Sequence, residues 1–432
     1  MKNVLFIYPP LTSHLVKSLL LAKYFRRNGY DVHYCINPKG IQSHLIAEFN
    51  ILPLNTFSLS TILSKKRKGS EIEVDEIKAQ FKQRGRELRQ LLEKYKPEYV
   101  FIDEFCSTDI LHLKKHFNTL NIIVLSTFIP SFPNQTIPPH NQFEFPGEHV
   151  AELWKKRSFP DGIKEENLSQ SRKKAVIELL FSMQKLPDKY AIWNYNAIHP
   201  SFSNISKWYL IPEEFDFKKQ ELKPWERYVG PMLNLNTQVN LEPLHELFLK
   251  LAKRTESSVC IYVSMGTVIE QMLSQEVLLN FYNNLITIGA GHPDWFFFIS
   301  IPSRLINIVK PLSLNVFIFP FCPQLAFMKK AHLFITHGGS SVYEAMFLKI
   351  PMLVFPPASN YDYNGHAARI VFHGLGEKAS FEDSSDIIAT RIQSILNTKQ
   401  YSRNLDKFQK ILRRKYQKNY PANLFTQLPP EI

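Results

Sequence analysis

Two polar residues of the N-terminal half stand where acid–base chemistry could be done. His14 follows the apolar run Val4–Tyr8, and Asp103 follows the apolar run Tyr99–Ile102. A neutral imidazole can take the proton of a hydroxyl as that hydroxyl attacks a substrate, and a carboxylate can orient the ring and stabilise the imidazolium. Glu104 is adjacent and is an alternative acid. A histidine in a turn is more often structural than catalytic, so on these residues alone both interpretations stay open.

The C-terminal half contains a pattern that suits phosphate binding. The apolar run Leu333–Thr336 leads into the segment 337–341, His-Gly-Gly-Ser-Ser, after which a helix is predicted to begin. Free backbone N–H groups at a helix start bind anions, and glycines let the backbone approach a phosphate closely. Glu344 lies one helical turn further on, where it could accept hydrogen bonds from ribose hydroxyls. The alternative is a plain turn in which Ser341 caps the helix and Glu344 is a solvated acid of its first turn.

The elements that would position these residues alternate between strands and helices. In the first unit Val4–Tyr8 is predicted to be a strand, apolar residues recur at helical spacing from Leu15 to Phe25, and Asp31–Ile36 is predicted to be the next strand. The rhythm continues with strands predicted at Tyr99–Ile102, Ile122–Leu125, Val259–Val263, Trp295–Ile299, Val316–Phe319, Leu333–Thr336 and Met352–Phe355, and helices at Glu71–Tyr95, Lys173–Lys185, Val268–Leu285 and Leu405–Tyr416. This pattern predicts an α/β fold of two doubly wound, Rossmann-like domains that face each other across a cleft.

The domain limits follow from changes of composition along the chain. Residues 128–196 are rich in Pro, Phe, Asn and Lys and are predicted to carry binding loops. The proline-punctuated segment Pro212–Pro231 is predicted to be an interdomain linker. We therefore predict an N-terminal domain at 1–230, a C-terminal domain at 231–400, and a final segment at 401–432 whose helix packs back on the N-terminal domain.

The charge of the chain limits its partners. The 432 residues include 52 Lys and Arg against 39 Asp and Glu, a net charge of +13 that suits an anionic membrane surface or a phosphorylated ligand. Nucleic acid is not expected as a partner, because no basic face interleaved with stacking aromatics is found. The basic clusters 65–68 and 154–157 could contact a membrane, although solvated surface charge is the favoured interpretation.

Cysteines and apolar runs indicate the compartment. Four cysteines lie far apart in the chain, at Cys35, Cys106, Cys260 and Cys322. Their spacing excludes a zinc ribbon and a disulfide framework and is typical of a reducing compartment. Pro9-Pro10 interrupts the N-terminal apolar run, so no signal peptide is expected, and no stretch approaches the roughly 18 apolar residues of a membrane span. We expect a cytoplasmic protein, with peripheral contact at the inner face of a membrane left open.

Further motifs occur in order around the glycine pair. They are Tyr228–Pro231 (Tyr-Val-Gly-Pro), Tyr262–Thr267 (Tyr-Val-Ser-Met-Gly-Thr), Phe321–Gln324 (Phe-Cys-Pro-Gln), Thr336–Ala345 and Asp362–Ile370. With these motifs the sequence resembles family 1 of the nucleotide-sugar-dependent glycosyltransferases, the UDP-glycosyltransferase family, and is similar to bacterial members that act on macrolides and carotenoids. The resemblance is strong over Val259–Glu377. It implies the GT-B fold, with an acceptor-binding N-terminal domain and a nucleotide-sugar-binding C-terminal domain.

The resemblance also implies a role for each motif residue. His14 would be the general base with Asp103 as its helper, and Phe321 would stack on the nucleobase. Gln324 and the backbone around Cys322 would read the edge of that nucleobase; without the resemblance, Phe321 and Gln324 would be interpreted as a core aromatic and a surface amide. The other donor-binding roles fall on His337, Gly339, Ser340 and Ser341 for the diphosphate, Gly266 and Thr267 near the β-phosphate, Glu344 for the ribose, and Asp362 and Tyr363 for the sugar.

The sequence departs from the family pattern at two places. One residue is missing from the diphosphate loop 337–344, which leaves the roles of Ser340 and Ser341 interchangeable. Tyr363 stands where the family has Gln, which puts glucose in doubt as the transferred sugar, although a tyrosine can still donate a hydrogen bond. Both departures motivate the alternative of a non-catalytic member that binds a nucleotide sugar.

These residues and this resemblance predict an inverting glycosyltransferase that moves a hexose from a nucleotide sugar to a hydroxyl of a small lipophilic acceptor. UDP is the preferred nucleotide because Glu344 can use both ribose hydroxyls, and dTDP stays an alternative. No cofactor or metal is expected, since no carboxylate cluster requires magnesium or manganese. A nicotinamide oxidoreductase is disfavoured because Gly-x-Gly-x-x-Gly is missing after the first strand. A membrane-associated glycolipid synthase is a further alternative.

Overall fold

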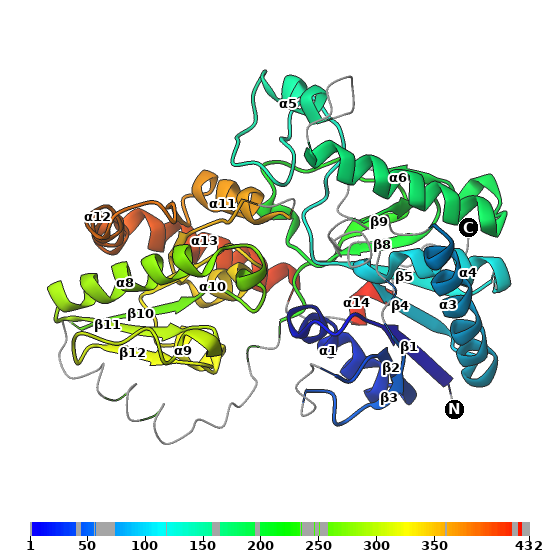
Figure 1. Ribbon diagram of the computed structural model, residues 1–432, viewed down its shortest axis with the longest axis horizontal. Helices are drawn as coiled ribbons and strands as arrows, with labels where there is room; N and C mark the ends of the chain where they lie inside the picture. The colour runs from blue at the N-terminus through cyan, green and yellow to red at the C-terminus, as the bar shows by residue number, and fades with distance from the viewer. Residues whose placement is uncertain are drawn as a thin grey trace.

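The computed structural model describes residues 2–39, 45–55, 57, 74–117, 119–157, 165–194, 199–233, 235, 246, 250, 258–358, 361–416 and 422–425. A large parallel sheet lies in each half of the chain, and helices cover both sheets (Figure 1). A small antiparallel pair, β6 (Ile192–Asn194) with β7 (Ser201–Phe202), lies between strands of the N-terminal sheet in the sequence. The predicted α/β organisation into two doubly wound halves is confirmed.

The N-terminal sheet has the strand order β3-β2-β1-β4-β5-β8-β9, and every neighbouring pair is parallel. Its strands are β1 (Lys2–Ile7), β2 (Tyr30–Ile36), β3 (Asn50–Pro53), β4 (Tyr99–Asp103), β5 (Asn121–Ser126), β8 (Ser206–Tyr209) and β9 (Glu226–Tyr228). The order reverses between β1 and β4. Open α/β sheets bind ligands at such a reversal, because the loops after the two strands part there.

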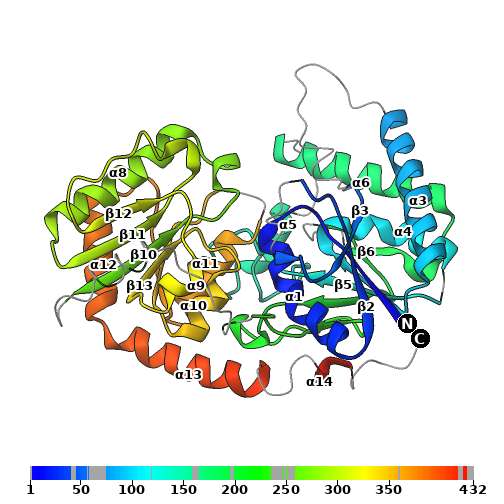
Figure 2. The ribbon, with the colours of Figure 1, turned by 90° about the horizontal axis from the view of Figure 1, so that it is seen from below.

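Helices bury both faces of this sheet, which is why its strands are almost continuously apolar. Val4 and Phe6 belong to the apolar cluster of one face, and Leu5 and Ile7 to the cluster of the other. The helices are α1 (Thr12–Arg27) and α14 (Ala422–Phe425) on the first face, and α3 (Val74–Tyr95), α4 (Ile110–His116) and α6 (Glu165–Gln184) on the second (Figure 2). Helix α5 (Val150–Arg157) belongs to the loop region that follows β5.

The C-terminal sheet repeats this plan with the order β12-β11-β10-β13-β14-β15 and parallel pairing throughout. Its strands are β10 (Val259–Ser264), β11 (Trp295–Ser300), β12 (Val316–Phe319), β13 (Leu333–Thr336), β14 (Met352–Val354) and β15 (Gly376–Lys378). Its helices are α8 (Gln275–Gly291) and α12 (Ser385–Asn397) on one face, and α9 (Gln324–Met328), α10 (Val342–Leu348), α11 (Tyr363–Phe372) and α13 (Lys399–Tyr416) on the other. The order reverses between β10 and β13.

Several predicted elements are corrected by the structure; the helices predicted from Lys173 and from Leu405 begin earlier, at Glu165 and Lys399. The segment Pro212–Pro231 is not only a linker, because β9 (Glu226–Tyr228) pairs with β8 at the edge of the N-terminal sheet. The helix predicted at Val268–Leu285 begins at Gln275, where the Ser274 hydroxyl accepts the N–H of Val277 and caps it. The remaining short elements are 3₁₀ turns at Glu104–Asp109, Asp188–Tyr190, Glu213–Phe215, Ile269–Gln271 and Ser303–Leu305.

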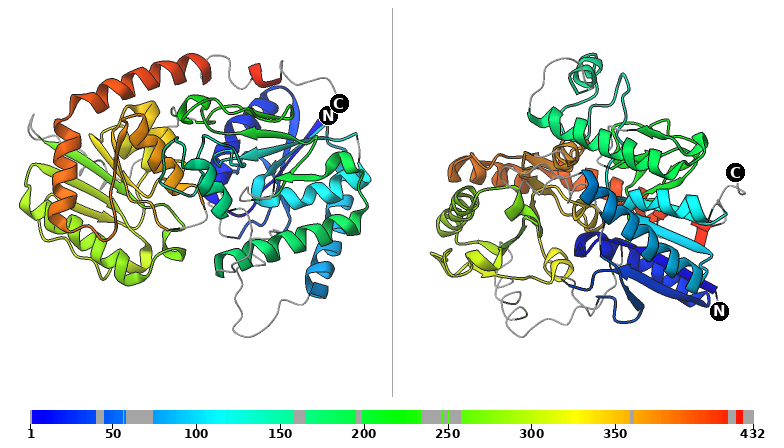
Figure 3. Two further views of the ribbon diagram at one scale, coloured as in Figure 1. Left: turned by 90° about the horizontal axis from the view of Figure 1, so that it is seen from above. Right: turned by 45° about the vertical axis from the view of Figure 1, so that its right-hand side comes forward.

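The C-terminal segment lies along both halves (Figure 3). Helix α13 packs against α10, and at its end Lys415 pairs with Glu213 and Glu214 of the N-terminal half. Phe425 of α14 stacks on Tyr24 of α1, with 5.4 Å between the ring centroids. The exact domain limits stay predictions, since most of the chain between 234 and 257 lies outside the described residues.

Candidate active site

His14 and Asp103 meet at the reversal point of the N-terminal sheet. His14 lies in the first turn of α1, the helix that follows β1, and Asp103 is the last residue of β4. The His14 Nδ1 and Asp103 Oδ2 atoms are 2.8 Å apart, and the Asp103 Oδ1 atom accepts the backbone N–H of Phe105 at 3.0 Å. That second bond fixes the carboxylate, so the predicted pair is assembled with a defined orientation.

The surroundings of His14 favour its charged form. Burial would lower the pKa of His14, but the charge and hydrogen bond of Asp103 outweigh it, with help from Glu104 and Asp362, and the pKa is raised above 6.5. The alternative acid Glu104 is engaged elsewhere, because it accepts a hydrogen bond from Lys207 Nζ at 2.9 Å. The geometry therefore favours Asp103 as the partner of the imidazole.

Aromatic rings form a wall beside His14. The Phe105 ring lies edge-on to the imidazole at a centroid distance of 4.9 Å, and the Phe128 ring lies at 5.9 Å. Tyr361, from the C-terminal half, stacks near both rings, at 6.4 Å from Phe105 and 6.0 Å from Phe128. The sequence reasoning missed these three residues, although Phe105 and Phe128 follow strand ends at the edge where ligands bind. The candidate base thus faces an apolar, aromatic environment.

His337 lies where the strand order of the C-terminal sheet reverses, between β10 and β13. His337 follows β13, and Gly266 follows the neighbouring strand β10. A Cβ atom on Gly266 would lie 2.5 Å from the imidazole Cε1, and a Cβ on Gly339 would lie 2.7 Å from its Nε2. Gly266 also has a φ of +71°, which favours glycine. The imidazole therefore lies in a slot that is open because Gly266 and Gly339 have no side chain.

His337 is a neutral side chain in this slot. Burial and the neighbouring His366 lower the pKa of His337 to about 4. Its Nδ1 atom is buried and has no hydrogen-bond partner within the described part of the chain. A buried nitrogen without a partner is costly, so a bound group that supplies one would be favoured there.

The remaining diphosphate candidates surround this histidine. Gly266 and Thr267 are exposed, whereas Ser340 and Ser341 are half-buried at the start of α10. Ser341 occupies the position before the helix, but its side chain makes no capping hydrogen bond. The alternative in which Ser341 serves only as a cap is therefore not supported.

Phe321, the residue predicted to stack on the nucleobase, is 56% exposed, so the alternative of a core aromatic is wrong. Cys322 is buried, and burial raises the pKa of its thiol to about 12, which keeps it protonated. The Gln324 Nε2 atom donates a hydrogen bond to Glu344 Oε2. Gln324 is therefore oriented by Glu344 and is not a free surface amide.

Glu344 has a second partner that comes from the other half of the molecule. The Lys17 Nζ atom of α1 lies 3.0 Å from Glu344 Oε1. Both oxygens of the predicted ribose-binding carboxylate thus accept hydrogen bonds. The sequence reasoning did not single out Lys17, although it stands three residues after His14 and so on the same side of α1.

Of the two predicted sugar-binding residues, Asp362 contacts the N-terminal half and Tyr363 lies beside His337. Asp362 is buried, its Oδ2 atom accepts the backbone N–H of Ile129 at 3.0 Å, and the same oxygen lies 3.5 Å from His366 Nε2. The Tyr363 ring lies 4.9 Å from the His337 ring, and burial raises the pKa of the Tyr363 hydroxyl. Tyr363 thus stays protonated and keeps a hydrogen to donate.

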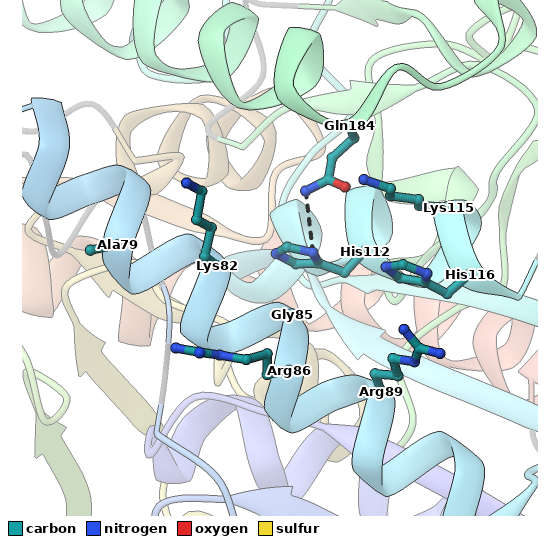
Figure 4. Close-up of a pocket in the computed structure, with 9 residues that line it drawn as sticks. All are labelled: Ala79, Lys82, Gly85, Arg86, Arg89, His112, Lys115, His116 and Gln184. Carbon is teal, nitrogen blue, oxygen red and sulfur yellow. Dashed lines mark hydrogen bonds between the residues drawn. The ribbon is translucent and has the colours of Figure 1, made fainter.

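A basic hollow of about 500 Å³ lies apart from these residues, between α3 and α4 on the N-terminal half (Figure 4). Positive side chains from both helices line it, and Gln184 Nε2 lies 3.3 Å from His112 Nδ1 at its floor. The cationic lining residues are Lys82, Arg86, Arg89 and Lys115, with His116 beside them.

Of the predicted basic clusters, 65–68 lies outside the described residues. In the other, Trp154 is buried and donates to Ile137 O at 2.8 Å.

The described residues include neither a membrane span nor a metal-binding cluster. No helix there is both long enough and apolar enough to span a bilayer. In the same residues, no group of three or more His, Cys, Asp or Glu side chains is arranged to hold a metal ion.

The chain is similar to proteins of known family. A family model described as "UDP-glucoronosyl and UDP-glucosyl transferase" matches residues 177–421, more than half of the chain. The zeaxanthin glucosyltransferase of Pantoea ananas is 37% identical over 94 residues, 22% of this chain and 21% of that protein. The uncharacterized UDP-glucosyltransferase YdhE of Bacillus subtilis (strain 168) is 21% identical over 423 residues, 94% of this chain and 93% of that protein.

Solved structures share the architecture. The glycotransferase of kitacinnamycin has a TM-score of 0.71 at 19% identity, with 99% of each chain covered. The calicheamicin glycosyltransferase has a TM-score of 0.68 at 16% identity, with 100% of each chain covered. These likenesses confirm the predicted GT-B fold class.

Proposed function

Because the chain belongs to the UDP-glucoronosyl and UDP-glucosyl transferase family, and so is a hexosyltransferase that uses a nucleotide sugar, we propose that His14 is its general base and that Asp103 orients the ring. The observation that carries this assignment is the 2.8 Å contact between His14 Nδ1 and Asp103 Oδ2 at the sheet reversal. With Nδ1–H donated to the carboxylate, Nε2 is the nitrogen that can accept a proton.

The proposed reaction is a single displacement. The acceptor oxygen forms a bond to the anomeric carbon while the bond from that carbon to the diphosphate oxygen breaks, and His14 takes the hydroxyl proton. Asp103 stabilises the imidazolium that results. Attack from the side opposite the leaving group inverts the anomeric centre.

The donor site of this proposal lies around His337. The exposed Phe321 ring offers a face for a nucleobase, and Glu344 suits the ribose diol. Backbone N–H groups of 338–342, the His337 ring and the Gly266–Thr267 turn would hold the diphosphate. We propose that this set of donors serves without a metal ion or other cofactor, with UDP preferred and dTDP the alternative.

The acceptor we propose is a small lipophilic alcohol or phenol. Support comes from Phe105 and Phe128, whose rings lie beside the imidazole that must receive the acceptor proton, and from Tyr361, which stacks against both rings. Aromatic rings pack favourably on planar apolar ligands and exclude water from the reacting atoms. A polar, heavily hydroxylated acceptor would leave its hydroxyls unpaired against such a wall.

A membrane-associated glycolipid synthase is the second candidate, and the basic hollow between α3 and α4 favours it. Co-sedimentation with vesicles that contain an anionic lipid tests it, with R86E/K115E as the variant that should stay in the supernatant. If the wild-type protein also stays in the supernatant, this candidate is removed.

Calorimetric and thermal-shift titrations with UDP, dTDP, GDP and NAD, in magnesium and in EDTA, test the donor site. UDP at a hundredfold its Kd should add about 2.7 kcal/mol of stability, and the shift should persist in EDTA. Glu344→Ala should weaken UDP more than dTDP, because only ribose carries the 2′-hydroxyl. If no nucleotide binds, the donor site is wrong. If UDP binds but neither donor hydrolysis nor transfer to any acceptor is seen, the non-catalytic alternative holds.

A further inference from the structure

A buried ion pair links the two halves at the proposed donor site. Lys17 of α1 and Glu344 of α10 are 327 positions apart in the chain, and their Nζ and Oε1 atoms lie 3.0 Å apart. The side chains are only 6% and 12% exposed. Burying an ammonium is costly unless an anion accompanies it, so Lys17 depends on a partner in this place.

The donor-site segments of the C-terminal half contain no cation of their own. Lys and Arg do not occur in 264–272, 321–328, 336–346 or 361–366. The next cation along α11, Arg369, is bound to Asp216 through its Nε and Nη2 atoms at 3.0 and 2.7 Å. The His337 side chain is neutral. A nucleoside diphosphate bound there would meet hydrogen-bond donors but no positive charge from these segments.

A nucleotide would also change the surroundings of Lys17. Glu344 already accepts hydrogen bonds on both oxygens, from Lys17 and from Gln324. Ribose hydroxyls that bind this carboxylate compete with those donors. The diphosphate is joined to the ribose, and the loop 337–341 proposed to hold it directly precedes α10, which carries Glu344. When a nucleotide binds, its ribose would therefore engage Glu344 while its diphosphate lies near Lys17.

We propose that Lys17 is a donor-binding residue contributed by the N-terminal half, which exchanges Glu344 for the diphosphate when the nucleotide binds. This inference rests on the proposed function, since it requires a nucleoside diphosphate at Glu344. Lys17 stands one helical turn from His14 on α1. The same helix would then bring the base to the acceptor and the cation to the leaving diphosphate.

Calorimetric titration with UDP and with uridine tests the exchange, because only UDP carries the diphosphate. Lys17→Met should weaken UDP by about tenfold or more, since a hydrogen bond to a charged group is lost. Its uridine affinity should stay equal or increase, because Glu344 loses a competing donor. Lys17→Arg should retain most of the UDP affinity. Lys23→Met, on the same helix and paired with Glu48 at the surface, is the matched control and should bind both ligands as the wild type does.

The outcomes separate the proposed donor site from the proposed role of Lys17. If the wild-type protein binds neither ligand, the proposed donor site falls. If it binds both, and Lys17→Met binds UDP as tightly as the wild type or loses UDP and uridine equally, only the role of Lys17 is overturned. Lys17→Gln, measured beside Lys17→Met, should likewise weaken UDP and spare uridine. Glu344→Gln should weaken the binding of both ligands, because both contain the ribose. The two kinds of variant therefore separate ribose contacts from diphosphate contacts.

Discussion

Asp103 holds His14 across the reversal of the N-terminal sheet, at 2.8 Å between Oδ2 and Nδ1, although the two residues are 89 positions apart. The strand register makes this contact possible. Strands β1 and β4 are parallel neighbours with Ile7 opposite Ile102, so the residues that follow both strands emerge at the same edge. The contact follows from the pairing of the two strands, because adjacent parallel strands bring their carboxyl ends together at one edge of the sheet.

Replacing Asp103 should therefore change the pH dependence of the reaction. The base must be neutral to accept a proton, and the pKa of His14 is raised above 6.5 mainly because Asp103 overcomes the effect of burial. Activity should rise as the pH passes above this raised value. Asp103→Asn removes the negative charge that stabilises the imidazolium, so the pKa of His14 should fall. The acid limb of kcat/KM should then move to lower pH while the rate falls. The measurement is UDP release from a panel of UDP-hexoses with small phenols as acceptors, between about pH 5 and 9, on both sides of the ordinary histidine pKa of about 6.5. An acid limb that does not move would show that Asp103 does not control His14.

The buried pair between Arg369 and Asp216 should matter for stability. Both side chains are at most 1% exposed, and they join α11 to the N-terminal half. Arg369→Met leaves Asp216 buried without its cation and should lower the free energy of unfolding by about 3–5 kcal/mol. Urea unfolding measures the loss. Arg391→Met, in a more exposed pair with Glu377, is the control and should cost less than about 1 kcal/mol. Equal losses for the two variants would contradict the account.

Gly266→Ala should disturb the slot that holds His337. The new methyl group would lie 2.5 Å from the imidazole Cε1, in a backbone conformation with a φ of +71°. Overpacking of this kind costs roughly 1–3 kcal/mol, and the displaced ring should weaken UDP binding as well. Gly291→Ala, where nothing lies within 4 Å of the new atom, is the matched control and should leave UDP affinity unchanged. Tight UDP binding by Gly266→Ala would remove the His337 slot from the donor site.

The departure at Tyr363 predicts a change of donor preference. Its ring lies 4.9 Å from His337, and its hydroxyl stays protonated. Tyr363→Gln restores the family residue and should shift the preference toward UDP-glucose in competition with other UDP-hexoses. Tyr363→Phe, which keeps the ring and removes the hydroxyl, should not produce this shift. An unchanged donor profile in Tyr363→Gln would take this residue out of the sugar site.

The strands and the donor motifs could be predicted because their signals are local. Val4–Tyr8 and Val259–Val263 are continuously apolar since both faces of each sheet are covered, and the residues that follow them fall at the ligand-binding edge. The three-residue strand β9, between prolines, gave no such signal and was predicted as a linker. Trp154, in the cluster 154–157 for which membrane contact was considered, is buried, and its indole N–H donates to the carbonyl of Ile137.

Contacts between the halves could not be predicted from local patterns. The pair of Lys17 with Glu344 and the approach of Tyr361 to Phe128 depend on how two separately folded sheets face each other. No spacing along the chain encodes that arrangement. The sequence did place His14 and Asp103 at strand ends, but the preference for Asp103 over Glu104 came from the structure, where Lys207 engages Glu104.

His14→Ala tests the base assignment most directly, when UDP affinity is determined by calorimetry and transfer from a panel of UDP-hexoses to the phenol panel is determined by UDP release. If His14 is the base, transfer should fall to background while UDP affinity stays within about twofold of the wild type, because the base contacts the acceptor proton and not the nucleotide. Retained transfer, or a loss of UDP binding as large as the loss of transfer, would contradict the assignment of His14 as the general base.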